Sequence, residues 1–534
     1  MANSRAWFYT AAGYQIYPKS FQDSNHDGIG DLGGITSRLD YIKGLGIDFI
    51  WICPFFESPD KDNGYDVSDY RSIKACYGTM RDFERLAQGI HQRGMKLVLD
   101  LVLNHTSNQH PWFIKSKHNT SHQDWYIWRE GKVNREGELL PPNNWTGFFG
   151  GSAWTYVEER QQFYLHLFTP YQPDLNWANE EVRKEMADIM NFWIEKGADG
   201  FRLDAVSYLD KPDDFSDASM DQNGKAFPME RLAAGKKLGD YFRELRGRLI
   251  HSDVLLIGEM AGVGPAAAIK MAPPDQSQLN MVFQFEVNDL DGGETFKYNH
   301  RRIEIKDLKR VLFRWQRQLY LKSWNTLFYN NHDEPRIVSR IFIDNTKREA
   351  QAKALACALY FLQGTPFIYQ GEELGMVNSE FESEEELRDI AGILAFRNPL
   401  LKEKYGEKEL LHIISQKGRD SARTPMQWDD SKYAGFSNQE PWIKVNPDYV
   451  NNNLKAQLNS NSSVYHFYKN LLQVRKDPIF WDGKVREIED IDQDVIAYIR
   501  ENKKERVMVI VNLSDSAKPF TLAEEFKRGE VLLR

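Results

Sequence analysis

Four short apolar segments of this chain each stop abruptly at charged or imidazole side chains, and this pattern constrains the fold more than any other feature. The segments are residues 100–105, 200–204, 255–259 and 328–333. In a (β/α)8 barrel, polar side chains at the carboxyl ends of all strands point toward one site. Such a barrel would bring together the polar residues of these segments, namely Asp204, Glu259, Asp333, Arg202, His105 and His332.

Strand and helix signals alternate along most of the chain, which is typical of parallel βα units. Phe83, Leu86 and Ile90, for example, share one face of a helix that we expect to end near Gly94. Residues 97–103 are almost wholly apolar, as expected for a strand covered on both faces. The full set of expected strands is 14–17, 49–53, 97–103, 200–204, 255–257, 281–285, 327–329 and 367–369, enough for one barrel.

Two segments interrupt this alternation, and the end of the chain differs again. Residues 105–175 are rich in Trp, Asn, Gly and Pro without helical period, so we expect an inserted domain after strand 3. A charged segment at about 378–420 predicts an insertion over the barrel mouth, and strand-like residues near the end predict a C-terminal antiparallel β domain. The expected boundaries are 1–104 and 176–455 for the TIM barrel, 105–175 for the inserted domain and 456–534 for the C-terminal domain.

Composition excludes several classes of protein. The formal net charge of −9 lacks the basic excess of a nucleic-acid-binding protein, and the 3 Cys are too few and scattered for a disulfide framework or a zinc site. The first residues lack the apolar core of a secretory signal. The longest apolar stretch, near 354–362, is shorter than the roughly 18 residues that span a bilayer. We therefore expect a cytoplasmic protein without nucleic-acid or membrane partners.

The acids at the strand ends suggest a chemistry, because two carboxylates flanking a bond are the equipment for glycoside hydrolysis. Arg202 lies on the same strand face as Asp204, so its charge should lower the pKa of Asp204 and keep this group ionised. Glu259 follows an apolar run, where a carboxyl has a raised pKa and can serve as a general acid. The alternatives are a surface ion pair for Asp204, a helix N-terminal acid for Glu259 and an N-cap for Asp333. Three acids at three strand ends favour a glycosidase.

Residues 23–34 match the first part of a calcium-binding loop. Oxygen-bearing side chains stand at positions 1, 3, 5 and 9, with Gly at 6 and a backbone carbonyl at 7, but Gly34 replaces the bidentate Glu expected at position 12. We expect structural Ca²⁺ here and no organic cofactor; the alternative is a polar turn without metal. The expected ligands are Asp23, Asn25, Asp27, the carbonyl of Ile29, and Asp31.

At these residues the chain resembles glycoside hydrolase family 13, the α-amylase superfamily, and within it the group of oligo-1,6-glucosidases, dextran glucosidases and α-glucosidases. The resemblance covers nearly the whole chain. Besides the strand-end motifs, it rests on the segments at 14–21, 62–66, 149–154, 172–177 and 423–428, which occur in this order.

The resemblance implies roles for individual residues. Asp204 would be the nucleophile of a retaining enzyme, Glu259 the acid/base and Asp333 the stabiliser of the transition state. Asp62 and Arg419 would bind the non-reducing-end hydroxyls and close the pocket, which makes the enzyme exo-acting. The other implied substrate-binding residues are Tyr65, as a stacking platform, with His105, Phe149, Arg202, Ala205 and His332. The substrates would be short α-glucosides, which could also serve as donors for transglucosylation. A monomer is compatible with the sequence.

Linkage preference depends on residues beside the catalytic acids. In α-1,6-specific enzymes of this group the residue after the nucleophile tends to be Val, whereas here it is Ala205. Met260 and Ala261 also depart from the Thr-Trp pair typical of α-1,6 members. These departures favour maltose and malto-oligosaccharides over the alternative, an oligo-1,6-glucosidase or dextran glucosidase.

Other members of the superfamily remain as rivals. Trehalose-6-phosphate hydrolase would need a cationic cluster for the phosphate at the pocket rim. Isomaltulose synthase is disfavoured because no Arg-Leu-Asp-Arg-Asp motif follows residues 284–286. The heavy subunits of amino-acid transporters are binding proteins with a transmembrane anchor, and some lack the catalytic acids that this chain has.

Overall fold

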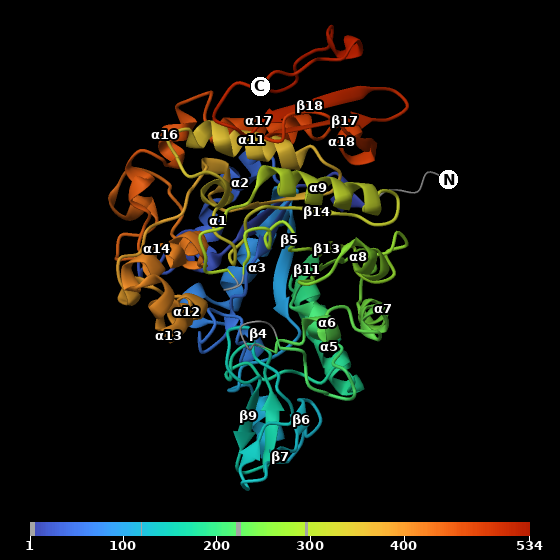
Figure 1. Ribbon diagram of the computed structural model, residues 1–534, viewed down its shortest axis with the longest axis vertical. Coiled ribbons are helices and arrows are strands. Elements are labelled where there is room, and N and C mark those ends of the chain that lie inside the picture. Colours follow the sequence, from blue (N-terminus) through green and yellow to red (C-terminus); the bar gives the residue numbers. More distant parts are fainter. Residues whose placement is uncertain (1–5, 119, 221–225, 294–296) are drawn as a thin grey trace.

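The computed structural model describes residues 6–118, 120–220, 226–293 and 297–534. Its centre is a sheet of eight parallel strands in the order β13-β12-β11-β5-β2-β1-β15-β14. An isolated parallel bridge between Val282 and Asn325 links the two ends of this sheet. The strands therefore form a nearly closed (β/α)8 barrel, which confirms the expected fold class (Figure 1).

The eight strands lie where the sequence predicts them. The seventh differs most, because it ends at Leu327 and leaves Phe328 and Tyr329 in the loop that follows. The strands are β1 (Gly13–Ile16), β2 (Phe49–Ile52), β5 (Lys96–Val102), β11 (Gly200–Asp204), β12 (Leu255–Glu259), β13 (Met281–Phe283), β14 (Thr326–Leu327) and β15 (Thr365–Tyr369).

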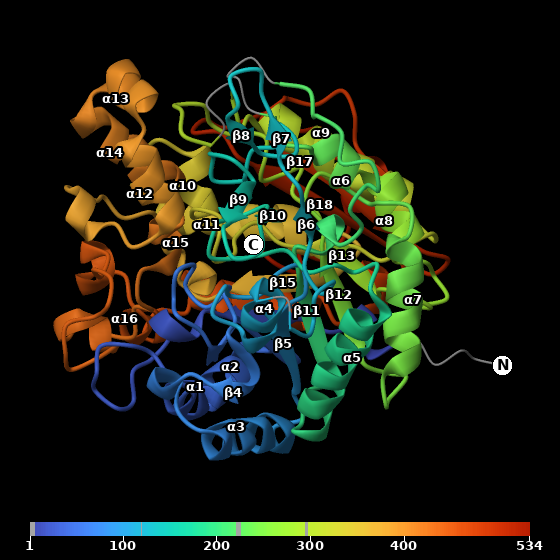
Figure 2. The ribbon, with the colours of Figure 1, turned by 90° about the horizontal axis from the view of Figure 1, so that it is seen from below.

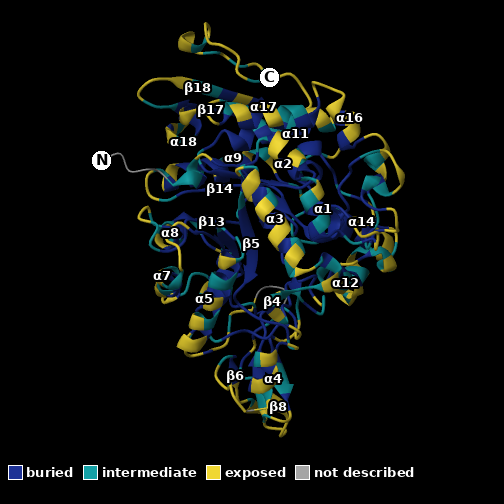
Figure 3. Ribbon diagram, turned by 180° about the vertical axis from the view of Figure 1, so that it is seen from behind, coloured by how far each residue is buried: buried dark blue, intermediate teal, exposed yellow. Residues whose placement is uncertain are grey.

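Helices surround the barrel, as the view from below shows (Figure 2). In α3 (Met80–Gln92), a capping box between Thr79 and Asp82 satisfies the first free N–H groups, and Phe83, Leu86 and Ile90 are buried. Figure 3 shows β5 buried while α3 carries exposed residues on its outer side. The other surrounding helices are α1 (Leu32–Ser37), α2 (Leu39–Leu45), α5 (Glu180–Glu195), α7 (Leu238–Arg248), α8 (Pro265–Met271), α9 (Ile305–Leu319) and α11 (Arg348–Tyr360).

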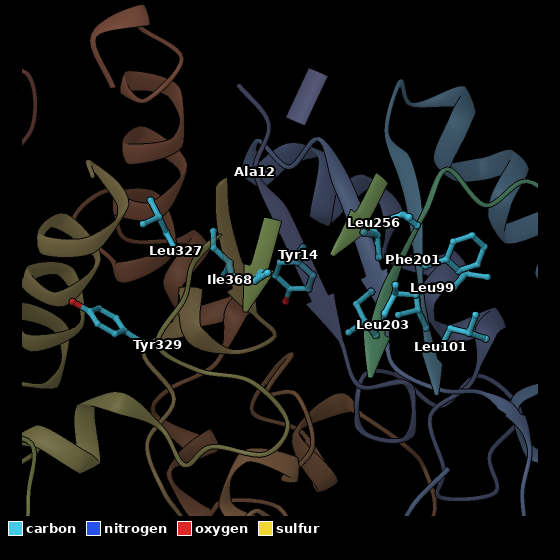
Figure 4. Close-up of a cluster of buried hydrophobic side chains, with 14 of the residues drawn as sticks. Ala12, Tyr14, Leu99, Leu101, Phe201, Leu203, Leu256, Leu327, Tyr329 and Ile368 are labelled. Atoms are coloured by element: carbon cyan, nitrogen blue, oxygen red, sulfur yellow. The ribbon is translucent and has the colours of Figure 1, made fainter. Parts of the chain in front are cut away.

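Successive strand residues point to opposite faces, so each barrel strand divides its side chains between helices and barrel interior. On the helix side, Leu99, Leu101, Phe201, Leu203 and Leu256 belong to the main hydrophobic core (Figure 4). On the interior side lies a second buried cluster of apolar residues, which includes Phe49, Trp51, Val98, Leu255, Ile257, Phe283 and Phe367. The interior positions further along the same strands are Asp100, Arg202, Asp204 and Glu259. The interior therefore changes from apolar to charged toward the carboxyl ends of the strands.

Three appendages extend the barrel. After β5, the chain forms α4 (Pro111–Lys117), a hairpin of β7 (Lys132–Val133) and β8 (Leu139–Leu140), and an antiparallel sheet of β6 (Trp128–Arg129), β10 (Gln162–Leu165) and β9 (Trp154–Val157). An isolated bridge between His105 and Asp174 joins the two ends of this excursion. The segment after β15 forms α12 (Ile390–Arg397), α13 (Pro399–Tyr405) and α14 (Glu407–Lys417), beside the barrel in Figure 1.

The C-terminal region carries the expected antiparallel sheet, with β16 (Lys484–Glu487), β17 (Val495–Glu501) and β18 (Arg506–Asn512). It also contains α17 (Val464–Val474), which packs against α11 of the barrel. No helix in the described ranges combines the length and apolar character needed to cross a bilayer.

Candidate active site

Arg202 binds three carboxylates at the carboxyl ends of neighbouring barrel strands. Its Nη1 lies 2.8 Å from Asp100 Oδ1 and 2.6 Å from Asp204 Oδ1, and its Nη2 lies 2.6 Å from Glu259 Oε1. The second oxygen of Glu259 accepts a 2.8 Å hydrogen bond from the backbone N–H of Ala205. The ends of β11 and β12 thus bring the predicted acids Asp204 and Glu259 to one arginine, and β5 adds Asp100.

The protonation of Asp204 differs from the sequence-based expectation. Arg202 does contact this carboxylate and lowers its pKa, but burial and the negative charge of Glu259 raise the pKa of Asp204 by more, so that the net shift is upward. One guanidinium cannot compensate three acids, and burial also raises the pKa of Asp100 to about 6. The expectation of a lowered pKa was wrong because the sequence does not show that Asp100 and Glu259 share the same arginine.

Asp333 lies in the opposite electrostatic setting. Its Oδ1 is 2.9 Å from Arg423 Nη2 and 3.2 Å from Arg419 Nε. Burial alone would raise the pKa of Asp333, but the positive charges of Arg419 and Arg423 hold it far below its usual range. Asp333 is therefore ionised over the whole ordinary pH range.

The alternative roles for these acids do not fit the structure. The helix after Asp333 is α10 (Ile337–Ile341), whose N-cap is Arg336. The helix after Glu259 is α8, with Gly264 at its N-cap. Neither acid caps a helix, and Asp204 is only 7% exposed, so it is not part of a surface ion pair.

His332 is held between aromatic rings beside Asp333. The Tyr65 ring stacks on it at 5.1 Å between centroids with an interplanar angle of 4°, and Tyr17 stacks at 6.0 Å and 14°. The Nδ1 atom lies 2.9 Å from Gln15 Nε2, and the Nε2 atom lies 3.2 Å from Asp333 Oδ2. Burial keeps the pKa of His332 well below its usual value, so the ring is neutral. A neutral ring in this position can donate one hydrogen bond to a ligand hydroxyl.

Asp62 and His105 meet through a shared amide. Gln172 Nε2 lies 2.9 Å from Asp62 Oδ2 and 3.1 Å from His105 Nε2. Arg419 Nη1 lies 3.7 Å from the other oxygen of Asp62, which has no hydrogen-bond partner among the described residues. Burial raises the pKa of Asp62 to about 7 and lowers that of His105 to about 3. This buried, incompletely satisfied oxygen is suited to accept a hydrogen bond from a sugar hydroxyl.

Phe149 and Ala205 border this site from different directions. The Arg419 guanidinium carbon lies 5.2 Å from the Phe149 ring centroid, a cation–π contact between the inserted segment and the segment after α14. Ala205 has left-handed backbone angles, with φ 50° and ψ 31°, and its side chain packs in a buried cluster with Tyr208 and Phe215. The side chain of Ala205 thus supports the wall beside Glu259.

The predicted calcium loop has the expected turns but no cluster of acids. Asp23 Oδ1 accepts the N–H groups of Asn25 and His26, and Asp31 caps α1 by accepting the N–H of Gly34. In the described parts of the chain, no three His, Cys, Asp or Glu side chains converge as a metal site. The carboxylates are directed to backbone N–H groups as in a polar turn, so calcium binding stays a prediction.

Sequence reasoning missed several residues of the site, among them Asp100, Asp389 and Arg423. Asp389 is fully buried and lies 2.8 Å from Arg423 Nη1 and 3.8 Å from Arg419 Nη1. Arg423 opens the Arg-Thr-Pro-Met-Gln-Trp motif, which marked a resemblance without a role for this residue. Asp100 opens the strand-end segment that predicted His105. The available signal was its spacing, because Asp100 stands two residues after Val98 on the same strand face, which leads into the barrel interior.

Comparison with known proteins agrees with this geometry. The family described as "Alpha amylase, catalytic domain" matches residues 15–483. The chain belongs to the α-amylase family. The oligo-1,6-glucosidase of Parageobacillus thermoglucosidasius is 45% identical over 539 residues, which cover 99% of this chain and 94% of that protein. An α-glucosidase of Pediococcus pentosaceus is 44% identical, over 89% of this chain and 86% of its own length.

Solved structures of the α-amylase family extend the similarity. The trehalose-6-phosphate hydrolase of Bacillus licheniformis superposes with a TM-score of 0.92 at 40% identity, covering 98% of this chain and 93% of that one. The chain is thus a glycoside hydrolase of the α-glucosidase type within the α-amylase family. The comparison confirms the expected family and fold.

Proposed function

We propose that this α-amylase-family enzyme releases glucose from the non-reducing end of short α-1,6-linked glucosides, with retention of configuration. The observation that carries the proposal is the closed charged end of the site, where Arg419 joins Asp62 to Asp333. We infer that these contacts block one end of the site, so that a single terminal glucose binds between them and the carboxylates on Arg202. Such a pocket favours exo-action on one terminal glucose.

The arrangement around Arg202 supports double displacement. Retaining enzymes hold their two carboxyl groups about 5–5.5 Å apart, whereas inverting enzymes hold them about 6.5–9.5 Å apart. Asp204 and Glu259 bind the two terminal nitrogens of one guanidinium, each at 2.6 Å, which favours the short separation. Asp204 would attack the anomeric carbon, and Glu259 would protonate the leaving oxygen and then deprotonate water. The ionised Asp333 would stabilise the positive charge that develops on the sugar ring.

Support for the α-1,6 linkage comes from the relatives. The relative at 45% identity and 99% coverage is named for oligo-1,6-glucosidase activity. The glucan 1,6-α-glucosidase of Streptococcus pneumoniae is a further relative, at 41% identity over 98% of this chain. These names favour the alternative that the sequence left second, rather than the preference for maltose inferred from Ala205.

A second candidate, hydrolysis of α-1,4-linked maltose, keeps one observation in its favour. Ala205 is the residue after the nucleophile, and its small side chain leaves the wall beside Glu259 less crowded than Val would. One side chain in an apolar pocket changes discrimination by only about 1–3 kcal/mol, so this observation weighs less than near full-length similarity.

Initial rates on isomaltose, maltose and trehalose 6-phosphate, measured at equal concentrations, test the substrate proposal. We expect the highest kcat/KM on isomaltose. A higher kcat/KM on maltose or on trehalose 6-phosphate would refute the α-1,6 preference. Proton NMR of the first turnovers tests the mechanism separately, because retention gives α-glucose first and inversion gives β-glucose first.

A further inference from the structure

A cleft with a positively charged lining lies behind the Asp333 loop, outside the site described above. Its empty volume is about 360 Å³, part of which opens to solvent. The cationic and imidazole side chains that line it are Arg301, Arg302, Arg340, Lys417, His300 and His412. Within the described ranges, no Asp or Glu lines this cleft.

Neighbouring carboxylates pair with most of these side chains but not with Arg301 and Arg302. His300 Nε2 lies 2.8 Å from Glu409 Oε1, and His412 Nδ1 lies 3.1 Å from Glu380 Oε2. Asp291 binds Arg340 at 2.7 Å and Lys417 at 2.6 Å. Arg301 and Arg302 donate Nη1 hydrogen bonds to backbone carbonyls instead, at 2.7–3.0 Å, and neither forms an ion pair with a described carboxylate. Their positive charges are therefore available to a ligand.

Two buried residues give the cleft a fixed floor. Arg340 is 3% exposed and Lys417 is 5% exposed. Arg340 Nη1 lies 3.3 Å from Glu334 Oε2 but has no hydrogen-bond partner among the described residues. A buried guanidinium N–H without an acceptor is costly, and an oxyanion would supply the missing acceptor.

We propose that this cleft is a second ligand site, which binds a tetrahedral oxyanion such as inorganic phosphate or the phosphate group of a sugar phosphate. Planar guanidinium groups bind phosphate oxygens in pairs, and the cleft offers Arg301, Arg302 and Arg340 together. The proposal is independent of linkage preference in the active site.

The surrounding contacts connect this cleft with the catalytic loop. Glu334, which faces Arg340, also lies 3.3 Å from Lys297 Nζ, and Lys297 donates a 2.6 Å hydrogen bond to the backbone carbonyl of Asp333. Lys417 is two residues before Arg419, which contacts Asp333. An anion in the cleft therefore acts close to the loop that carries Asp333.

Calorimetric titration of the full-length enzyme with inorganic phosphate, at constant ionic strength in chloride buffer, tests the proposal. We expect saturable binding in wild type and at least tenfold weaker binding in Arg302→Gln. Because Arg302 also supports backbone carbonyls, a second variant, Gln416→Glu, places a negative charge at the cleft without removing a cation. Gln473→Glu, exposed on α17, is the matched control and should bind like wild type.

The same titration with glucose 6-phosphate identifies the source of the anion. Competition with phosphate indicates a sugar-phosphate site, and binding of phosphate alone indicates a site for the free ion; both support the proposal. Saturating glucose should leave phosphate binding unchanged, because the cleft is separate from the glucose pocket. The proposal is overturned by absent saturable binding, by equal affinity in both cleft variants and wild type, or by loss of binding in glucose.

Discussion

The two ends of the active site use arginine in opposite ways. At one end, the single guanidinium of Arg202 binds Asp100, Asp204 and Glu259. At the other end, Arg419 and Arg423 both contact the carboxylate of Asp333. The same two arginines also pair with Asp389, and Arg419 lies near Asp62. A carboxylate that shares one guanidinium with two other acids retains its proton more easily, whereas a carboxylate contacted by two guanidinium groups loses it more easily.

This difference assigns different chemical tasks to the two ends. At the Arg202 end, where the pKa of Asp204 and of Asp100 is raised, the group of acids can retain a proton, and in the proposed mechanism Glu259 is the acid that transfers it. The Asp333 end has a fixed negative charge, which suits electrostatic stabilisation. Carboxylates of one chemical type thus acquire separate roles from the number of guanidinium groups around them.

The largest expected effect comes from removing the carboxylate that attacks the sugar. Asp204→Asn should lower kcat on a chromogenic α-glucoside by about 10⁴-fold or more, because the covalent step is lost. Arg202 would still bind Asp100 and Glu259, so circular dichroism should show a folded enzyme. A variant that keeps more than a hundredth of wild-type kcat would contradict the assignment of Asp204 as nucleophile.

Weakening the contacts at the Asp333 end should produce a smaller loss of activity. Arg419→Gln removes the contacts with Asp333 and Asp62, and kcat/KM should fall by about 10–150-fold, equivalent to about 1.5–3 kcal/mol for a hydrogen bond to a charged group. The pKa of Asp333 should rise, because one of its two guanidinium partners is lost. Arg397→Gln is the control, because Arg397 is an exposed residue of the same insertion and pairs with half-buried Glu384. Equal losses in both variants would argue against a specific role for Arg419.

The wall beside Glu259 belongs to the acid-rich end and should affect linkage choice. Ala205→Val should raise the ratio of kcat/KM for isomaltose to that for maltose by about tenfold, because a β-branched side chain crowds the α-1,4 acceptor more. The left-handed backbone already costs Ala205 about 1–2 kcal/mol, and a β-branched side chain tolerates this conformation less well than Ala, so Tm should also fall. Ala205→Gly removes that strain and serves as the control for stability. An unchanged substrate ratio in Ala205→Val would separate Ala205 from linkage preference.

Stability should respond to the two ends with opposite sign. The pKa of Asp333 is lowered on folding, so its ionised form stabilises the native state above its unfolded pKa of about 3.9, and this contribution is lost as pH falls. The pKa of Asp204 is raised, so its ionised form destabilises the native state at high pH. At pH 8, Asp333→Asn should lower the free energy of unfolding by about 3–5 kcal/mol, as for a broken buried ion pair, whereas Asp204→Asn should leave it unchanged or raise it. Thermal denaturation of both variants decides the point, and losses of equal size would refute the electrostatic contrast.

Some parts of this contrast could be read from the sequence and others could not. The ends of β11 and β12 were predictable because apolar runs stop at Asp204 and Glu259, and the Arg202 contact followed from its spacing. Asp333 lies instead in the loop after β14. Asp389 and Arg423 are 34 residues apart in the chain, and their pairing exists only in the folded molecule. The direction of the pKa shift of Asp204 likewise depends on how many acids share Arg202. Local spacing identifies a pair, but the charge balance of a site requires every neighbour.

The smallest effect is expected from removing the ion of the predicted calcium loop. This experiment tests whether the contrast between the Arg202 end and the Asp333 end is independent of a structural ion outside the active site. If Asp23, Asn25, Asp27, Asp31 and the Ile29 carbonyl bind Ca²⁺, removal of the ion should lower Tm, because a ligand bound only to the folded state at 100 times its Kd contributes about 2.7 kcal/mol. For a chain of 534 residues this corresponds to about 2 °C. EDTA should therefore lower Tm slightly and leave the pH profile of kcat/KM unchanged.

Two variants test whether the loop is the site of this effect. Asp27→Asn should abolish the EDTA response, while Asp40→Asn, at an exposed acid elsewhere, should preserve it. The competing explanation is a polar turn without metal, because Asp23 and Asp31 accept hydrogen bonds from backbone N–H groups of the loop. In that case Tm would be the same with and without EDTA.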